Sequence, residues 1–324
     1  MTPPKDADPP TAIRRVEPPT EADLDQAWET VSARLAPTPL VASPLAPDAW
    51  LKLETMQPTG SFKVRGALAA LSRLPSGHHV IAASAGNHGL AVAWAAALHG
   101  LRATVVVSEQ ASPAKIAKLR AQPVELILHG DTDAAEAFAP TLVDPESSYV
   151  SPYNDTLVIA GQATVGRELE AQTSGPLTLV VPVGGGGLLS GAALWARTRG
   201  RHDVTLIGVE TCASLAVSTA VAAGRVVPIR YGDTIADGLV GNIETGSATV
   251  PLLSGVAFTC VDESEIRAGM RWLMVNHGVV AEGAGAVGVA AVLAGKVATG
   301  SRLVVLVTGR NVTPERYAAA IIEA

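Results

Sequence analysis

Short apolar runs rich in β-branched residues alternate with helix-like segments along most of the chain. The runs lie at residues 80–83, 103–107 and 124–128 in a first series and at 177–183, 205–209, 258–261 and 303–307 in a second. They are apolar throughout, which is typical of strands buried on both faces of a parallel sheet. The pattern predicts an α/β fold with two lobes, each an open, mostly parallel sheet wrapped by helices.

Capping residues indicate where several helices begin. Thr20 precedes a segment of helical periodicity, and Ser112-Pro113 supplies an N-cap followed by a first-turn proline. Asp262 with Glu265 has the spacing of a capping box. These signals support the assignment of helices between the strands.

The two strand series predict the domain boundaries. Residues 21–74 together with 152–324 are expected to form a large domain, and residues 75–151 a small α/β domain. Residues 1–20 are rich in proline and charge and lack the apolar run of a signal peptide, so we expect a disordered tail.

Composition narrows the classes of partner. Apolar residues make up 48% and charged residues 17% of the chain, which excludes a disordered or fibrous protein. A formal net charge of -6 leaves no basic surface for nucleic acid or anionic membranes. The longest uncharged stretch, residues 175–196, contains Pro182 and four consecutive glycines, which argues against a membrane span. A small-molecule partner is expected.

Two cysteines, Cys212 and Cys260, lie far apart in sequence and outside any C-x-x-C pattern. This spacing signals neither a disulfide framework nor a thiolate zinc site. We therefore expect a reducing compartment, the cytoplasm.

The most informative loop is the run of four glycines from Gly184 to Gly187, between a predicted strand and a predicted helix. Four glycines cost backbone entropy that an ordinary turn does not require, so a ligand is expected to approach the backbone closely. Amides at a helix N-terminus suit a phosphate group. A dinucleotide is the chief alternative, although only Glu210 comes near the position of a ribose-binding acidic residue. A nicotinamide-dependent oxidoreductase therefore stays open.

Three further motifs carry candidate chemistry. Lys63 follows a turn and precedes a run of small apolar residues, which predicts a partly desolvated amine of lowered pKa. The loop of residues 84–89 follows a strand and offers backbone amides with the Asn87 side chain to an anion. Thr308 ends the last predicted strand and faces the same cleft. Each motif alone has a plain structural interpretation, but together they describe a pocket for an aromatic phosphate aldehyde.

In the order and spacing of these motifs, the chain resembles the pyridoxal-phosphate (PLP) enzymes of the tryptophan-synthase-β fold type (fold type II), closest to the threonine/serine dehydratase branch. Residues 159–162 and 234–239 extend the similarity to nearly the whole chain. Residues 238–244 and 308–311 are similar to hydroxyectoine-utilisation dehydratases.

The resemblance implies a role for each motif. Lys63 would bind PLP covalently and act as the catalytic base, with Phe62 packed beside the cofactor ring. Thr308 would bond to the pyridine nitrogen, and Asn87 would lie against the cofactor 3′-oxygen. The phosphate would be held by Gly184, Gly185, Gly186, Gly187 and Leu188. The substrate carboxylate would be bound by Ser84, Ala85, Gly86, Asn87 and His88.

Two departures from relatives refine the expected activity. Serine racemases of this fold carry a serine at the position of Ala85, so a dehydratase is favoured over a racemase. Some relatives bind a cation where this chain has Glu210 and Ser214, but the third position is Ala216, so no metal ion is expected.

The expected activity is removal of water from a 3-hydroxy amino acid such as threonine or serine, giving a 2-oxo acid and ammonia. Racemisation or β-replacement is the alternative within the same fold. The resemblance also implies a homodimer. Because little of the sequence follows Thr308, we expect no C-terminal regulatory domain.

Overall fold

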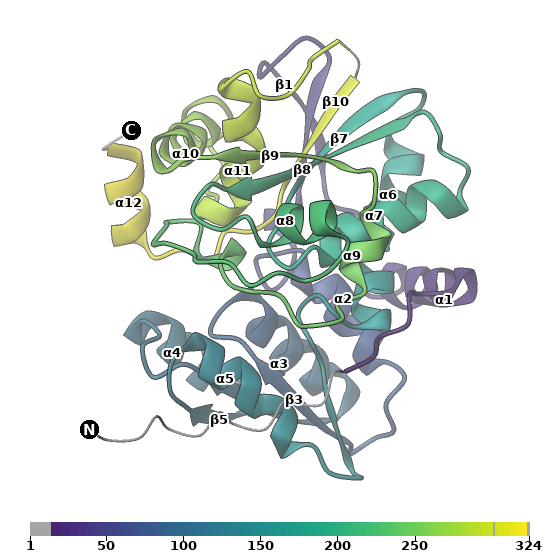
Figure 1. Cartoon of the computed structure of the whole chain (residues 1–324), viewed down its shortest axis with the longest axis vertical. Helices are drawn as coiled ribbons and strands as arrows, with labels where there is room; N and C mark the ends of the chain where they lie inside the picture. Colours follow the sequence, from purple (N-terminus) through teal and green to yellow (C-terminus); the bar gives the residue numbers. More distant parts are fainter. Residues whose placement is uncertain (1–13, 301, 323–324) are drawn as a thin grey trace.

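A six-stranded sheet and a four-stranded sheet form the two lobes of the chain in a computed structural model, which describes residues 14–300 and 302–322. The large lobe occupies the upper part of Figure 1 and the small lobe the lower part. This arrangement confirms the predicted α/β fold with two mostly parallel sheets.

The large sheet has the strand order β1-β2-β10-β7-β8-β9. Only the β1–β2 pair is antiparallel. Its strands are β1 (Leu40–Ser43), β2 (Ala49–Leu53), β7 (Leu177–Pro182), β8 (Val204–Thr211), β9 (Ala257–Val261) and β10 (Arg302–Val307). Its helices are α1 (Glu21–Ser32), α2 (Lys63–Leu71), α6 (Thr156–Gln172), α7 (Gly187–Thr198), α8 (Ala216–Ala223), α9 (Thr249–Leu252), α10 (Glu263–His277), α11 (Gly283–Leu293) and α12 (Pro314–Ile322).

The small sheet is parallel throughout, in the order β5-β4-β3-β6. It consists of β3 (His79–Ala83), β4 (Arg102–Val107), β5 (Glu125–Leu128) and β6 (Ser147–Tyr149), with helices α3 (Asn87–His99), α4 (Pro113–Arg120) and α5 (Thr132–Phe138).

Alternate residues of the central strands enter two different cores. Val304 and Leu306 of β10 pack with α2, α6 and α7, whereas Val305 and Val307 pack with α10 and α11. A parallel strand covered by helices on both faces buries every side chain, which explains the uninterrupted apolar runs.

The predicted helix starts are confirmed. Thr20 and Asp262 form capping boxes with the third residue of their helices, and Ser112 caps α4 with Pro113 in the first turn. Within the expected tail, the described residues make defined contacts: Arg14 pairs with Glu244, and Thr156 Oγ1 donates to the Glu17 carbonyl. The rest of that tail, residues 1–13, lies outside the described residues.

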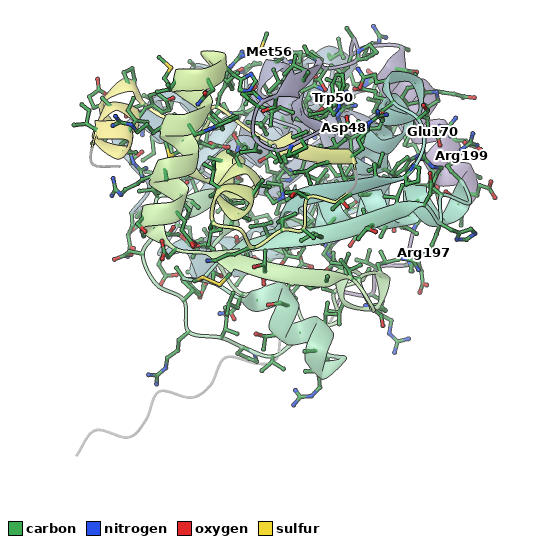
Figure 2. All side chains as sticks on the ribbon, turned by 90° about the horizontal axis from the view of Figure 1, so that it is seen from above. Asp48, Trp50, Met56, Glu170, Arg197 and Arg199 are labelled. Atoms are coloured by element: carbon green, nitrogen blue, oxygen red, sulfur yellow. A yellow bond between two sulfur atoms is a disulfide. The ribbon has the colours of Figure 1, made fainter. Side chains whose placement is uncertain are left out.

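The expectation of no disulfide is wrong, because Cys212 and Cys260 are joined by one, the yellow bond in Figure 2. Glu210 of β8 pairs with Cys260 of β9, and the Cys212 N–H donates to the Val261 carbonyl at 2.9 Å. This strand register brings the two cysteines together, and sequence spacing alone does not reveal it. Because disulfides persist mainly in oxidising environments, the cysteines no longer support a reducing compartment.

Reduction of this disulfide is expected to lower the free energy of unfolding by about 2–4 kcal/mol, because the bond closes a long loop in the unfolded chain. The separation of the two cysteines is 48 residues. The measurement is the guanidinium chloride midpoint with and without dithiothreitol, with the Cys212→Ser/Cys260→Ser variant as control. A midpoint that does not respond to dithiothreitol in the parent protein would contradict this prediction.

Within the described residues, none of the helices combines the length and apolar character that crossing a bilayer requires.

Candidate active site

A cavity of about 620 Å³ opens between the two lobes, and residues of both lobes line it. A volume of this size is typical of small-molecule sites. The cavity brings together every residue that the sequence assigned to the site. These are Phe62, Lys63, Ser84, Ala85, Gly86, Asn87, His88, Gly184, Gly185, Gly186, Gly187, Leu188 and Thr308. Their individual roles remain predictions.

Lys63 is the first residue of α2, and main-chain bonds place it beside the end of β10. The Phe62 N–H donates to the Thr308 carbonyl at 3.1 Å, and the Arg310 N–H donates to the Gly60 carbonyl at 2.9 Å. The two segments therefore enter the cavity together.

The Lys63 amine is set up to act as a nucleophile. Its Nζ donates to the Pro152 carbonyl at 2.7 Å and lies 5.1 Å from the Phe62 ring centroid. Burial lowers the pKa of Lys63 to about 8, and the Glu136 carboxylate opposes that shift. Near pH 8, about half of the amines are neutral, as covalent attachment to an aldehyde requires.

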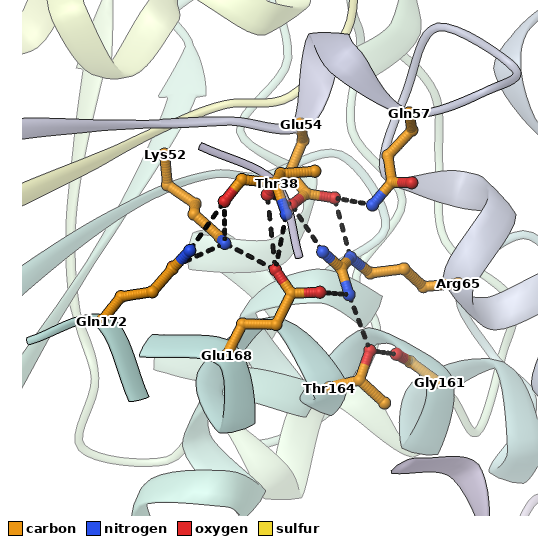
Figure 3. Close-up of polar contacts among 9 residues, drawn as sticks. All are labelled: Thr38, Lys52, Glu54, Gln57, Arg65, Gly161, Thr164, Glu168 and Gln172. Atoms are coloured by element: carbon orange, nitrogen blue, oxygen red, sulfur yellow. Dashed lines mark hydrogen bonds and ion pairs between the residues drawn. The ribbon is translucent and has the colours of Figure 1, made fainter. Parts of the chain in front are cut away.

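A buried network of charged side chains contacts α2 through Arg65, in the first turn of the helix (Figure 3). Arg65 pairs with Glu54 at 2.8 Å and with Glu168 at 2.7 Å, and Lys52 pairs with Glu168. The four side chains are almost fully buried. Breaking such a network leaves uncompensated charge in the core, at a cost of about 3–5 kcal/mol. It therefore fixes the helix turn that carries Lys63.

The glycine loop has no room for side chains. A Cβ at Gly185 would lie 2.2 Å from the Tyr153 ring, and one at Gly187 would lie 2.9 Å from the Tyr153 Cα. Gly186 has φ +86° and caps α7. The loop thus presents bare backbone and a helix N-terminus to the cavity, which suits a phosphate group.

The loop of residues 84–86 ends in the first turn of α3, which begins at Asn87. First-turn N–H groups have no acceptor within their own helix, and residues 84–88 line the cavity. The Gly86 N–H donates to Ser84 Oγ at 3.1 Å, which fixes the loop. This arrangement suits a carboxylate. Ala85 contributes no proton-donating side chain.

His88 is tied into the structure through its ring. The ring is buried and its Nε2 bonds to the Val150 carbonyl at 2.9 Å. Burial, with a smaller effect of the Lys63 charge, lowers the pKa of His88 to about 3. The imidazole therefore stays neutral at ordinary pH, and the main-chain N–H of His88 is the group available to a carboxylate.

The Asn87 side chain is held on both sides by residues that the sequence analysis did not assign to the site. Its Nδ2 donates to Glu282 Oε1 at 2.6 Å, and its Oδ1 accepts from Asn311 Nδ2. Burial raises the pKa of Glu282 to about 7. The sequence does contain a signal for Glu282, because it is the one charged residue between His277 and Lys296 in an otherwise apolar run.

Replacing Gly309 with alanine is expected to disturb this arrangement, because the new Cβ would lie 2.1 Å from Glu282 Oε1. The Glu282 carboxylate must then move, and Asn87, which donates to its Oε1, is expected to move with it. A displacement of Asn87 by about 1 Å is expected to lower kcat about 10²-fold. The matched control is Gly232→Ala, whose Cβ meets nothing within 4 Å. Equal kcat for the two variants would contradict this role of Gly309.

The possible cation ligand Glu210 is used structurally. Its Oε1 accepts from the Val217 N–H at 2.9 Å and the Ser218 N–H at 3.2 Å, at the start of α8. Among the described residues, no group of three or more His, Cys, Asp or Glu side chains is placed to hold a metal ion.

The residues of the cavity fit PLP. The bare-backbone loop suits the phosphate, and the Lys63 amine of lowered pKa suits the aldehyde. Thr308 is buried at the cavity wall, where its hydroxyl can bond to the ring nitrogen.

The chain matches the family described as "Pyridoxal-phosphate dependent enzyme" over residues 31–309. It belongs to this family. An L-threonine ammonia-lyase of Thermotoga maritima is 35% identical over 305 residues, covering 90% of this chain and 76% of that protein.

Two solved structures extend the similarity to the fold. A threonine deaminase from T.th. superposes with a TM-score of 0.81 at 33% identity, covering 91% of this chain and 99% of that one. A maize serine racemase superposes with a TM-score of 0.84 at 26% identity, covering 95% of this chain and 98% of that one. Dehydratases and racemases thus share this architecture, and residues within the cavity must separate them.

Proposed function

We propose that this PLP-dependent enzyme is an ammonia-lyase that removes water from a 3-hydroxy amino acid such as threonine or serine. The observation that carries the proposal is the convergence of three elements on one cavity: an amine of lowered pKa, a bare-backbone phosphate loop and a helix N-terminus for a carboxylate. The similarity to threonine ammonia-lyases supports the choice of reaction.

The reaction follows from the placement of these groups. Bound PLP supplies an electron sink for negative charge at the substrate Cα. The first turn of α3 holds the substrate carboxylate, and the Lys63 amine takes the Cα proton. Thr308 presents a neutral hydroxyl, which holds less positive charge on the pyridine nitrogen than an aspartate would. Negative charge at Cα would therefore be short-lived, and the β-hydroxyl would leave promptly as water once its oxygen has taken up a proton.

Racemisation needs a proton donor on the opposite face of the substrate. The residue at the corresponding loop position is Ala85, which has no exchangeable proton on its side chain. We therefore expect elimination to exceed racemisation.

The test is incubation of the holoenzyme with L-threonine and with L-serine. Release of 2-oxobutanoate or pyruvate in equal amounts with ammonia supports the proposal. A chiral assay on the same samples measures D-amino acid formation. Accumulation of the D-enantiomer without a 2-oxo acid would identify a racemase and contradict the proposal.

We further infer a homodimer and keep the domain division at residues 21–74 with 152–324 and 75–151. The cytoplasmic location stays an expectation from the family resemblance, and the Cys212–Cys260 disulfide argues against it. Sedimentation equilibrium tests the dimer. Alkylation of free thiols at the moment of cell lysis tests the compartment, because a cytoplasmic enzyme would be expected to carry Cys212 and Cys260 as thiols.

A further inference from the structure

The Pro152 carbonyl is the acceptor that holds the free Lys63 amine. Lys63 Nζ donates to it at 2.7 Å, and both residues line the cavity. An amine that donates one hydrogen to a fixed carbonyl carries its lone pair on another side of the nitrogen. The position of this carbonyl therefore sets the direction in which the free amine can react, and small displacements of a reacting group are costly.

The turn of residues 151–154, which carries Pro152, depends on side chains for its shape. Within the part of the chain that the structure describes, no main-chain N–H of this turn donates to a main-chain carbonyl. The side chains at its two ends, Ser151 and Asn154, are fully buried. The Asn154 N–H donates to Ser151 Oγ at 3.2 Å, which joins the two ends.

Glu244 binds both ends of this turn. Ser151 Oγ donates to Glu244 Oε1 at 2.6 Å, and Asn154 Nδ2 donates to Oε2 at 2.7 Å. Each carboxylate oxygen thus accepts from a buried donor on one side of Pro152. A carboxylate can accept at both oxygens, whereas a glutamine presents an NH₂ group at one of the two positions.

Arg14 contacts the same carboxylate from the N-terminal segment. Its Nη2 pairs with Glu244 Oε2 at 3.0 Å and also donates to the Asn154 carbonyl. The guanidinium carbon lies 5.3 Å from the centroid of the Tyr149 ring. Hydrogen bonds to an ionised group are roughly twice as strong as neutral ones, so Glu244 is a firm attachment point for the turn.

Glu244 is not among the residues that line the cavity, although the preceding residue, Ile243, is. Its effect on the reaction must therefore pass through the residues that it holds. Of these, Pro152 contacts the reactive amine directly.

We propose that Glu244 is a positioning residue for the Lys63 amine: by holding both ends of the 151–154 turn, it fixes the carbonyl to which the free amine donates. The inference deepens the proposed function and rests on it for the role of Lys63 as a base. Its first test measures covalent attachment of the cofactor and requires no turnover.

Glu244→Gln is expected to slow the covalent attachment of PLP to the apoenzyme by about 10–100-fold, the effect of displacing a reacting group by about 1 Å. In this step the Lys63 nitrogen bonds to the aldehyde carbon, and the aldehyde oxygen leaves as water. Stopped-flow absorbance at saturating PLP measures the first-order rate. A rate equal to that of the parent would overturn the proposal.

Pyridoxamine 5′-phosphate distinguishes positioning of the amine from damage to the whole site, because it has the ring and phosphate of PLP but no aldehyde. Tyr153, beside the phosphate loop, should keep its place, since its hydroxyl accepts from the main-chain N–H of Glu244 at 2.8 Å, which the substitution retains. We expect Glu244→Gln to change the affinity for this probe by no more than about twofold. A loss of affinity as large as the loss of attachment rate would overturn the proposal.

The matched control is Glu170→Gln. The Glu170 side chain is 24% exposed, close to the 28% of Glu244, and it accepts from Trp195 Nε1 at 2.9 Å and from Arg199 Nε at 3.1 Å. It does not line the cavity, and we expect parent-like attachment of PLP. Equal slowing in both glutamine variants would mean that loss of any such carboxylate has this effect, and would overturn the proposal.

Ser151→Ala tests the same link from the other partner. It removes the donor to Glu244 Oε1 and introduces no larger group into the core. We expect attachment of PLP to slow in the same direction as in Glu244→Gln, by a smaller factor, because Asn154 still binds Oε2. Attachment at the parent rate in Ser151→Ala would contradict this link between the turn and the amine.

Turnover relates this inference to the proposed function. We expect Glu244→Gln to lower kcat for L-threonine by about 10–100-fold and to leave KM within about twofold, because the substrate carboxylate is bound elsewhere, at the first turn of α3. A raised KM with unchanged kcat would assign Glu244 to substrate binding and overturn the proposal. Slowed attachment of PLP in Glu244→Gln, with no 2-oxo acid released by the parent enzyme, would contradict the proposed reaction and support the role of Glu244.

Discussion

Lys63→Ala is expected to lower kcat for dehydration of threonine or serine by about 10³-fold or more, the size of effect that follows loss of both a nucleophile and a base. Lys63 is the one lysine whose Nζ faces the Pro152 carbonyl inside the cavity, with a pKa lowered to about 8. An alanine at this position leaves no amine to bind the cofactor or to take the Cα proton. The measurement is the initial rate of 2-oxo acid formation at saturating substrate.

Two controls keep this result specific to the amine. Lys296→Ala removes a lysine that pairs with Glu265 at 2.6 Å, and it should retain full activity. Addition of methylamine to Lys63→Ala should restore part of kcat, since a small free amine can enter the vacated space. A folded Lys63→Ala enzyme with kcat close to that of the parent would contradict the account.

Gly185→Ala is expected to weaken PLP binding by about 10–100-fold, because the new methyl group would be forced into the Tyr153 ring. Its Cβ would lie 2.2 Å from that ring. Tyr153 cannot easily withdraw, since the ring is buried and its hydroxyl accepts from the Glu244 N–H at 2.8 Å. The loop that holds the phosphate must therefore move instead.

Titration of the apoenzyme with PLP, followed by absorbance, measures this effect. Gly232→Ala is the control, because its Cβ meets nothing within 4 Å. In the Gly185→Ala/Tyr153→Ala double variant the clash is removed, and part of the lost affinity should return. Parent-like affinity in Gly185→Ala alone would show that this loop does not hold the phosphate.

The parallel strands and their glycine loop could be predicted because the information is local. Residues 177–191 alone are enough to predict an apolar strand followed by glycines and a helix. Strand β2 escaped prediction because it contains Lys52, a charged residue that is buried only through its pairing with Glu168. That partner is 116 residues away in sequence.

The parts of the site that were missed depend on the same kind of distant contact. Glu282 reaches Asn87 across 195 residues, and the disulfide depends on the register of β8 with β9. Sequence patterns predict elements and exposed motifs, whereas contacts between residues far apart in sequence require the fold.

The most direct test of the central claim is reduction of the holoenzyme with borohydride, followed by proteolysis and mass spectrometry. The account predicts one peptide that carries a reduced pyridoxyl phosphate, attached to Lys63. Attachment to any of the other lysines, or no attachment at all, would contradict it.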